Sequence, residues 1–376
     1  MVLTLALRNL FHDRIRLIVT LVGILFSIVL VAVQLGLYLG AKRMIVDMID
    51  NAKGEIWITA FGAKSFEEGG VILTPRERHA ALATPGVKAV VPLVVSFAEW
   101  RKPGGGSTNS VLVGTDPEDG GLKPWGVVEG EAASMAAPDA VLVDRSYLTD
   151  LGITGMGATA QIEQGRVRVR ALTDGIRSFT QAPYVFTTAN RARALLGIPR
   201  ENSTFFLVQL QPRANIEAVR ADLKSRLSGT EVLTKTEFRN RSLDQWLFST
   251  GAGVALIGGA ILGLIVGIVI VAQTLYSSTK DHLNEFATLR ALGSSSGYII
   301  KVILAQAAFS AILGYILGMS IAMVVVAFSV QTALPILMTP ALAVFLFAIT
   351  FGMCAISAVS AIVKVTKIDP AMVFSR

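Results

Sequence analysis

The sequence is almost free of cysteine, because Cys354 is the only one. A single cysteine cannot form a disulfide within the chain, so a water-exposed part must be stabilised by its own hydrophobic core, which about 200 residues can supply. Charge is missing where the chain is most apolar. No Asp, Glu, Lys, Arg or His occurs in the runs 17–41, 246–279 and 302–363. Carriers coupled to protons or ions normally need such groups inside the membrane, so this absence disfavours a secondary transporter.

Nucleotide-binding and catalytic motifs are missing as well. The phosphate-loop pattern GxxxxGK[ST] occurs nowhere, and the glycine-rich loop 103–107 does not match it. The three histidines, His12, His79 and His282, are far apart and lack the spacing of metal ligands. The sequence has no nucleophile elbow, HExxH or paired-carboxylate signature. We therefore expect a non-catalytic protein with no metal and no cofactor of its own.

Apolar residues are abundant: they make up 52% of the 376 residues, and the mean hydropathy is +0.59. A run of about 20 apolar residues spans a bilayer. The run 302–363 is long enough for two crossings and is broken near Pro335 and Pro340, so the sequence predicts four spans. The expected fold is a membrane α-helical protein with four transmembrane helices and a large extracytoplasmic α+β domain between helices 1 and 2.

The net charge of +7 could suggest a nucleic-acid partner. However, the basic residues flank the spans and do not form a stripe, which argues against nucleic acid. Lys and Arg are retained on the cytoplasmic side of short loops. We therefore expect a multi-pass membrane protein with both termini cytoplasmic and the long insert on the outer side of the membrane. The first apolar run is too long for a signal peptide and is expected to be a retained anchor.

The chain is expected to divide into nine parts. In chain order these are a cytoplasmic amphipathic helix (1–16), transmembrane helix 1 (17–40), an extracytoplasmic domain with stalks (41–245), transmembrane helix 2 (246–276), a cytoplasmic helix (277–297), transmembrane helix 3 (298–328), a short extracytoplasmic loop (329–340), transmembrane helix 4 (341–363) and a cytoplasmic tail (364–376).

The insert carries strand and helix signals at both of its ends. Strands are predicted at 55–60 and 87–97, and Thr74, Pro75 and Glu77 form the start signal of a helix between them. A second β-α-β pattern covers 203–233, so the two units are expected to meet in space around a β-rich lobe.

One strand of this lobe alternates arginine with apolar residues. Arg166, Arg168 and Arg170 line one face of the strand. That face is either solvated and edge-protecting or a contact for an acidic partner.

A polar stretch, 278–293, separates the second and third spans. Leu283, Phe286 and Leu289 recur at helical spacing, Ser278 with Asp281 resembles a capping box, and Gly293 is a stop signal. The stretch predicts a short helix outside the bilayer. Its apolar face could seat in a groove of a partner protein or lie on lipid.

Glycine ridges mark two spans. Gly259, Gly263 and Gly267 follow each other at four-residue spacing in the second span, and Gly314 and Gly318 do the same in the third. Such ridges let helices approach closely. They predict tight packing within the bundle, with self-association as a further role.

The polar stretch also carries a resemblance to a known family. Residues 282–299, HLNEFATLRALGSSSGYI, resemble the cytoplasmic segment of the FtsX/MacB-type ABC transporter permeases, in which a Glu and an L-[RK]-A-[LIM]-G run recur. The form DHLxE[FY]ATL[RK]A at 281–291 is most similar to the DevC-like branch. The opening residues 7–36 and the closing residues 364–374 also resemble that branch.

The resemblance implies the permease subunit of a type VII, mechanotransmission ABC exporter of the bacterial inner membrane. In such a permease the insert is periplasmic, and the helix at 277–297 is the coupling helix. Its expected partners are a separate ATPase subunit that binds the ATP, a second copy of the chain in a homodimer, a periplasmic adaptor with an outer-membrane duct, and the lipid bilayer. The alternative is an FtsX-like regulator that transmits ATPase motion to a periplasmic enzyme. The implied ATPase-coupling residues are Leu283, Glu285, Phe286, Leu289, Arg290 and Gly293.

Overall fold

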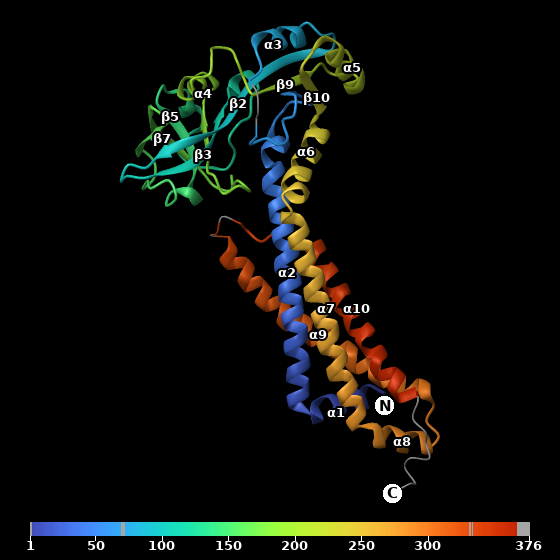
Figure 1. Ribbon diagram of the computed structural model, residues 1–376. Helices are drawn as coiled ribbons and strands as arrows, with labels where there is room; N and C mark the ends of the chain where they lie inside the picture. The colour runs from blue at the N-terminus through green and yellow to red at the C-terminus, as the bar shows by residue number, and fades with distance from the viewer. Residues whose placement is uncertain (1, 69–71, 331, 333, 367–376) are drawn as a thin grey trace. The chain divides into compact units, whose positions relative to one another are not determined.

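The computed structural model in Figure 1 describes residues 2–68, 72–330, 332 and 334–366. The chain forms two compact units. The first, here called the membrane unit, comprises 1–40, 254–330 and 335–376, and the second, here called the insert domain, comprises 41–253 and 331–334. From residue 367 onward, the predicted cytoplasmic tail at 364–376 lies outside the described residues.

The membrane unit is built from helices. Four are long and apolar enough to cross a membrane, as the sequence predicts: α2, α7, α9 and α10. The helices of this unit are α1 (Val2–His12), α2 (Arg14–Asn51), α7 (Ala252–Asp281), α8 (Leu283–Ala291), α9 (Ser296–Ser329) and α10 (Pro340–Thr366).

The helix starts around the second span differ from the prediction. The span does not begin at 246, because Asp244–Ser249 forms a π-helix and the backbone turns at Gly251, with φ +79°, before α7 begins. The predicted capping box at Ser278 is also wrong. The α7 helix runs past Ser278 to Asp281, so α8 is only nine residues long.

One half of the insert domain is an antiparallel sheet in the order β10-β1-β9-β2. Because β1 lies between β10 and β9, the two β-α-β units share one sheet. The α3 helix begins where its capping residues lie, with Thr74 N–H donating to the Glu77 carboxylate at 2.8 Å. The elements are β1 (Ile56–Ala60), α3 (Pro75–Leu82), β2 (Val87–Arg101), β9 (Phe205–Leu210), α5 (Ile216–Arg226) and β10 (Thr230–Thr234).

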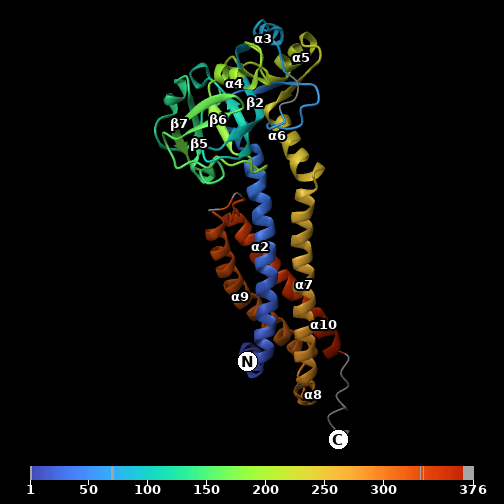
Figure 2. The same ribbon diagram turned by 60° about the vertical axis from the view of Figure 1, so that its left-hand side comes forward.

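The other half is the β-rich lobe, which continues from β2 through β3-β8-β5-β7-β4, with β6 pairing β2 and β7. Figure 2 shows β5, β6 and β7 together. Its elements are β3 (Ser107–Gly114), β4 (Val127–Glu129), β5 (Ala140–Asp144), β6 (Thr159–Ile162), β7 (Gly165–Thr173), β8 (Tyr184–Thr187) and α4 (Ala189–Leu196). The sequence prediction missed β4, β8 and α4, although Thr188 caps α4 and Gly197 ends it.

The arginine strand is β7, and it is not an edge strand, because β4, β5 and β6 all pair with it. The edge-protecting interpretation is therefore wrong. Arg168 and Arg170 lie 3.6 and 3.0 Å from the carboxylate of Asp139. The face is partly solvated and is partly neutralised within the domain.

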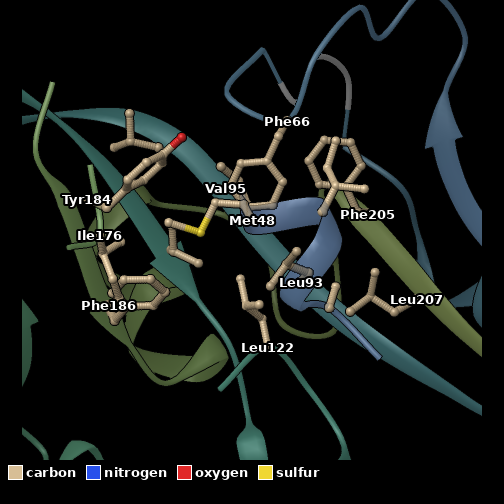
Figure 3. Close-up of a cluster of buried hydrophobic side chains, with 14 of the residues drawn as sticks. Met48, Phe66, Leu93, Val95, Leu122, Ile176, Tyr184, Phe186, Phe205 and Leu207 are labelled. Atoms are coloured by element: carbon tan, nitrogen blue, oxygen red, sulfur yellow. The ribbon is translucent and has the colours of Figure 1, made fainter. Parts of the chain in front are cut away.

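Aromatic rings dominate the core of the insert domain. Trp57 is fully buried and packs against Phe205 and Phe238, with ring centroids 5.7 and 4.9 Å apart. Figure 3 shows Phe66 and Phe205 in this cluster together with Met48 from α2. The helix α6 (Lys235–Leu243) contributes Phe238.

Candidate functional site

The segment between α7 and α9 is the candidate site, because it is the polar stretch that carries the family resemblance. His282 alone separates α7 from α8. Gly293, with φ +93°, provides the left-handed conformation that follows α8. Ser295 then accepts a hydrogen bond from Tyr298 N–H and starts α9. Both ends of α8 are thus tied closely to spans.

The inner face of α8 packs on the chain's own spans. Phe286 is 2% exposed, and it belongs to a buried cluster with Ala287, Ile24 of α2, Leu275 of α7 and Ile303 of α9. Phe286, which was predicted to seat in a groove of a partner, thus packs against residues of the chain's own spans. The helical spacing correctly identifies an apolar face, but the neighbouring spans already cover it.

The other predicted coupling residues lie in different environments. Leu289 is partly buried against the same cluster as Phe286. The Glu285 side chain is 60% exposed. The side chains of Leu283 and Arg290 lie outside the described part of the structure. Leu292, which the sequence prediction did not single out, follows α8 directly and is 79% exposed.

A charged contact joins the start of α2 to the end of α7. Arg16 Nη2 lies 2.5 Å from Asp281 Oδ2, and Asp13 accepts from Arg16 N–H at 3.2 Å. His282 Nδ1 lies 3.0 Å from the Glu285 carboxylate, and its ring lies 6.4 Å from that of His12. Sequence reasoning missed this contact. The opposite charges of Arg16 and Asp281, each beside a span, were the available signal.

Both glycine ridges lie against α2. A Cβ at Gly263 would meet Leu30, and one at Gly267 would meet Ser27 and Met353. The Ser27 hydroxyl also donates to the Gly263 carbonyl at 2.8 Å. The remaining ridge positions behave alike, with Gly259 facing Gln34, Gly314 facing Ile24 and Gly318 facing Ile28. The small residues therefore let α7 and α9 approach α2, which also contributes Ile24 to the cluster around Phe286.

A buried carboxylate in the insert domain was also missed. Glu67 is 3% exposed and accepts hydrogen bonds from Tyr184 OH at 2.6 Å and Ser178 Oγ at 3.0 Å. Burial raises the pKa of Glu67, and these hydrogen bonds offset part of that rise. The charged form is thus held in place by two hydroxyls and disfavoured by its apolar surroundings.

Within residues 2–68, 72–330, 332 and 334–366, no three His, Cys, Asp or Glu side chains come together as metal ligands.

Comparisons with known proteins give two matching family models. Residues 17–226 match the MacB-like periplasmic core domain, and residues 257–370 match the FtsX-like permease C-terminal domain. An uncharacterised ABC transporter permease of Mycobacterium tuberculosis is 26% identical over 372 residues, which cover 98% of each chain.

Two solved structures align with about half of the chain. The periplasmic region of MacB from Actinobacillus actinomycetemcomitans aligns with a TM-score of 0.39 at 12% identity, covering 52% of this chain and 96% of the other. The extracellular domain of the noncanonic ABC-type transporter YknZ from Gram-positive bacteria aligns with a TM-score of 0.35 at 14% identity, covering 48% and 99%.

Proposed function

This chain belongs to the family of MacB-like and FtsX-like ABC transporter permeases, and we propose that it couples ATP hydrolysis by a separate ATPase subunit to movement of its MacB-like domain. Such permeases are membrane subunits that work with an ATPase. The finer proposal is a mechanotransmission exporter that works as a homodimer with a periplasmic adaptor. Both termini and α8 would then face the cytoplasm.

The packing of α8 is the observation that carries this proposal. Phe286 ties α8 to Ile24 of α2 in one buried cluster. Without a break, the same helix α2 continues to Asn51 and places Met48 and Ile49 in the core of the insert domain. A force applied to α8 would therefore act on a helix that contributes to both hydrophobic cores.

The proposed contact with the ATPase lies on the outer side of α8. Glu285 and Leu292 are exposed there, whereas Phe286 serves as the internal anchor. An exposed apolar side chain beside a carboxylate suits a protein interface with an apolar centre and a polar rim.

The test is co-purification of the ATPase with the full-length permease. Leu292→Asp, alone and with Glu285→Lys, is expected to lower the recovered ATPase about tenfold, since a buried interface anchor contributes about 1–2 kcal/mol or more. Membrane insertion and thermal stability should not change. Phe286→Leu is the matched control, because it keeps an apolar anchor inside the cluster and should retain the ATPase. Undiminished co-purification with the double variant would refute the contact.

An FtsX-like regulator is the second candidate, because residues 257–370 match the FtsX-like permease domain. Here the insert domain would act on a periplasmic enzyme. Capture of a cell-wall hydrolase by the full-length permease would favour this function, whereas capture of an adaptor would favour export.

A further inference from the structure

A groove of about 930 Å³ opens in the insert domain along one edge of β2. On this edge β9 pairs with β2 from Val87 to Leu93, and β6 pairs with it only at Trp100 and Arg101. Among the described residues, no strand pairs with 94–99 on this edge, whereas β3 pairs the opposite edge throughout 94–101. The sheet therefore has a gap, one short strand in length, between β9 and β6.

The backbone of Phe97 faces this gap. Its ladder partner on β3 is Val111, whose N–H donates instead to the Pro183 carbonyl at 2.8 Å on the side of β8. Because hydrogen-bonded and non-hydrogen-bonded pairs alternate in an antiparallel ladder, Phe97 and Val111 form a non-hydrogen-bonded pair. The N–H and C=O groups of Phe97 consequently point away from β3 and toward the groove.

Side chains cap the edge on both sides of Phe97. Val95 N–H donates to Thr204 Oγ1 at 2.7 Å, and Glu99 N–H donates to Glu163 Oε1 at 2.9 Å. Within the described part of the chain, Phe97 N–H has no acceptor, and its carbonyl accepts only from Ser96 Oγ at 3.1 Å. Open strand edges are normally blocked by charge, proline or a bulge because they can pair with another chain. Here Val95 and Glu99 are capped, and Phe97 between them keeps a backbone that can pair with another strand.

The walls of the groove set its chemistry. One wall is the C-terminal end of α4, with Leu195, Leu196 and Ile198, and the Phe97 side chain is 43% exposed. The carboxylates of Glu68 and Glu163 line the groove. Arg191 is the cation of the lining, and its Nη2 donates to the Arg166 carbonyl at 2.7 Å. Among the described lining residues, carboxylates outnumber cationic side chains, and the end of α4 supplies an apolar wall.

We propose that this groove binds an extended peptide segment, which adds to the β2 edge at Phe97 and places basic side chains near Glu68 and Glu163. Strand addition supplies main-chain hydrogen bonds, and side-chain pockets supply specificity. The apolar wall at the end of α4 suits an aliphatic residue of the peptide between the basic ones. This inference goes beyond the coupling proposed for α8, and it stands whether or not α8 contacts an ATPase.

The test measures binding to the full-length permease in lipid nanodiscs by fluorescence anisotropy. The probe is a fluorescein-labelled pentapeptide of alternating valine and lysine, for which we expect a Kd on the order of 10–100 µM. The same peptide with glutamate in place of lysine should bind at least about tenfold more weakly, because like charges meet at the groove. Equal binding of the two peptides, or no binding of the lysine peptide at millimolar concentration, would overturn the proposal.

Two variants at Phe97 separate its backbone from its side chain. Phe97→Ala keeps the N–H and removes the ring, whereas Phe97→Pro also removes the N–H, which does not pair with β3. We expect Phe97→Pro to bind the lysine peptide about fivefold more weakly than Phe97→Ala, the effect of one lost hydrogen bond. Equal affinities of the two folded variants would rule out strand addition.

Glu163→Gln decides the matter if the proline variant does not fold. Glutamine keeps an oxygen that can accept from Glu99 N–H, so the cap is preserved while the charge is lost. We expect about threefold weaker binding of the lysine peptide and a smaller dependence on salt. Unchanged affinity and unchanged salt dependence would contradict the role of this carboxylate.

Discussion

The membrane unit and the insert domain are packed by opposite means. In the membrane unit, small residues such as Gly263 and Gly267 let α7 lie close to α2. In the insert domain, large rings such as Trp57, Phe205 and Phe238 fill one of the hydrophobic cores. In lipid there is no hydrophobic gain from burying one apolar surface against another, so close backbone approach matters most, whereas in water the buried apolar area matters most.

The α2 helix takes part in both kinds of packing. Its residues Ile24 and Ile28 lie against Gly314 and Gly318 in the membrane unit. Its residues Met48 and Ile49 enter the aromatic-rich core of the insert domain. The comparison therefore predicts that large-to-small changes weaken the insert domain most, and that small-to-large changes weaken the membrane unit most.

The largest effect is expected for Trp57→Ala. Removing a fully buried indole leaves a cavity among Phe66, Phe205 and Phe238, and such changes typically cost about 3–5 kcal/mol. Circular dichroism melting of the full-length protein in detergent should show early loss of the strand signal. Phe61→Ala is the control, because that ring is 77% exposed and its loss should change the melting by little. Similar melting temperatures of the two variants would show that the aromatic core is not the source of the insert domain's stability.

A smaller effect is expected for Gly267→Leu. The new side chain would meet Ser27 and Met353, which must move, and overpacking of this kind costs about 1–3 kcal/mol. Gly258→Leu in the same helix is the matched control, since no atom lies within 4 Å of a Cβ there. The recovery of folded permease from detergent extracts should fall for the first variant only. Equal recovery of the two variants would contradict the claim that close helix approach at glycine holds the membrane unit together.

The smallest effect on stability is expected for Glu67→Gln. Because the folded state raises the pKa of Glu67, the folded state binds its proton more tightly than the unfolded state. The stability that this group contributes is full below its unfolded pKa and is lost as the pH rises through the folded pKa. The variant should flatten this decline in the melting temperature of the insert domain. A steeper decline would show that the carboxylate is stabilised as an anion.

The prediction from sequence succeeded where local pattern is sufficient. The predicted capping residues of α3 lie at its start, because an N-cap depends only on neighbouring backbone. The family resemblance at 282–299 also needs no structure. The strand β8 and the helix α4 were missed because β8 is a four-residue buried strand without alternation, so its pattern is no stronger than that of a loop.

For the candidate site, the sequence alone determined that α8 is helical, that Phe286 belongs to its apolar face, and that the chain belongs with ABC transporter permeases. The tertiary structure decided that Phe286 faces the chain's own spans and that Leu292 remains exposed. It also decided that, among the described residues, no strand pairs with the edge of β2 at Phe97 that faces the groove. The physical reason is that periodicity fixes which side of a helix or strand is apolar, whereas the surface that covers that side comes from residues far away in the chain.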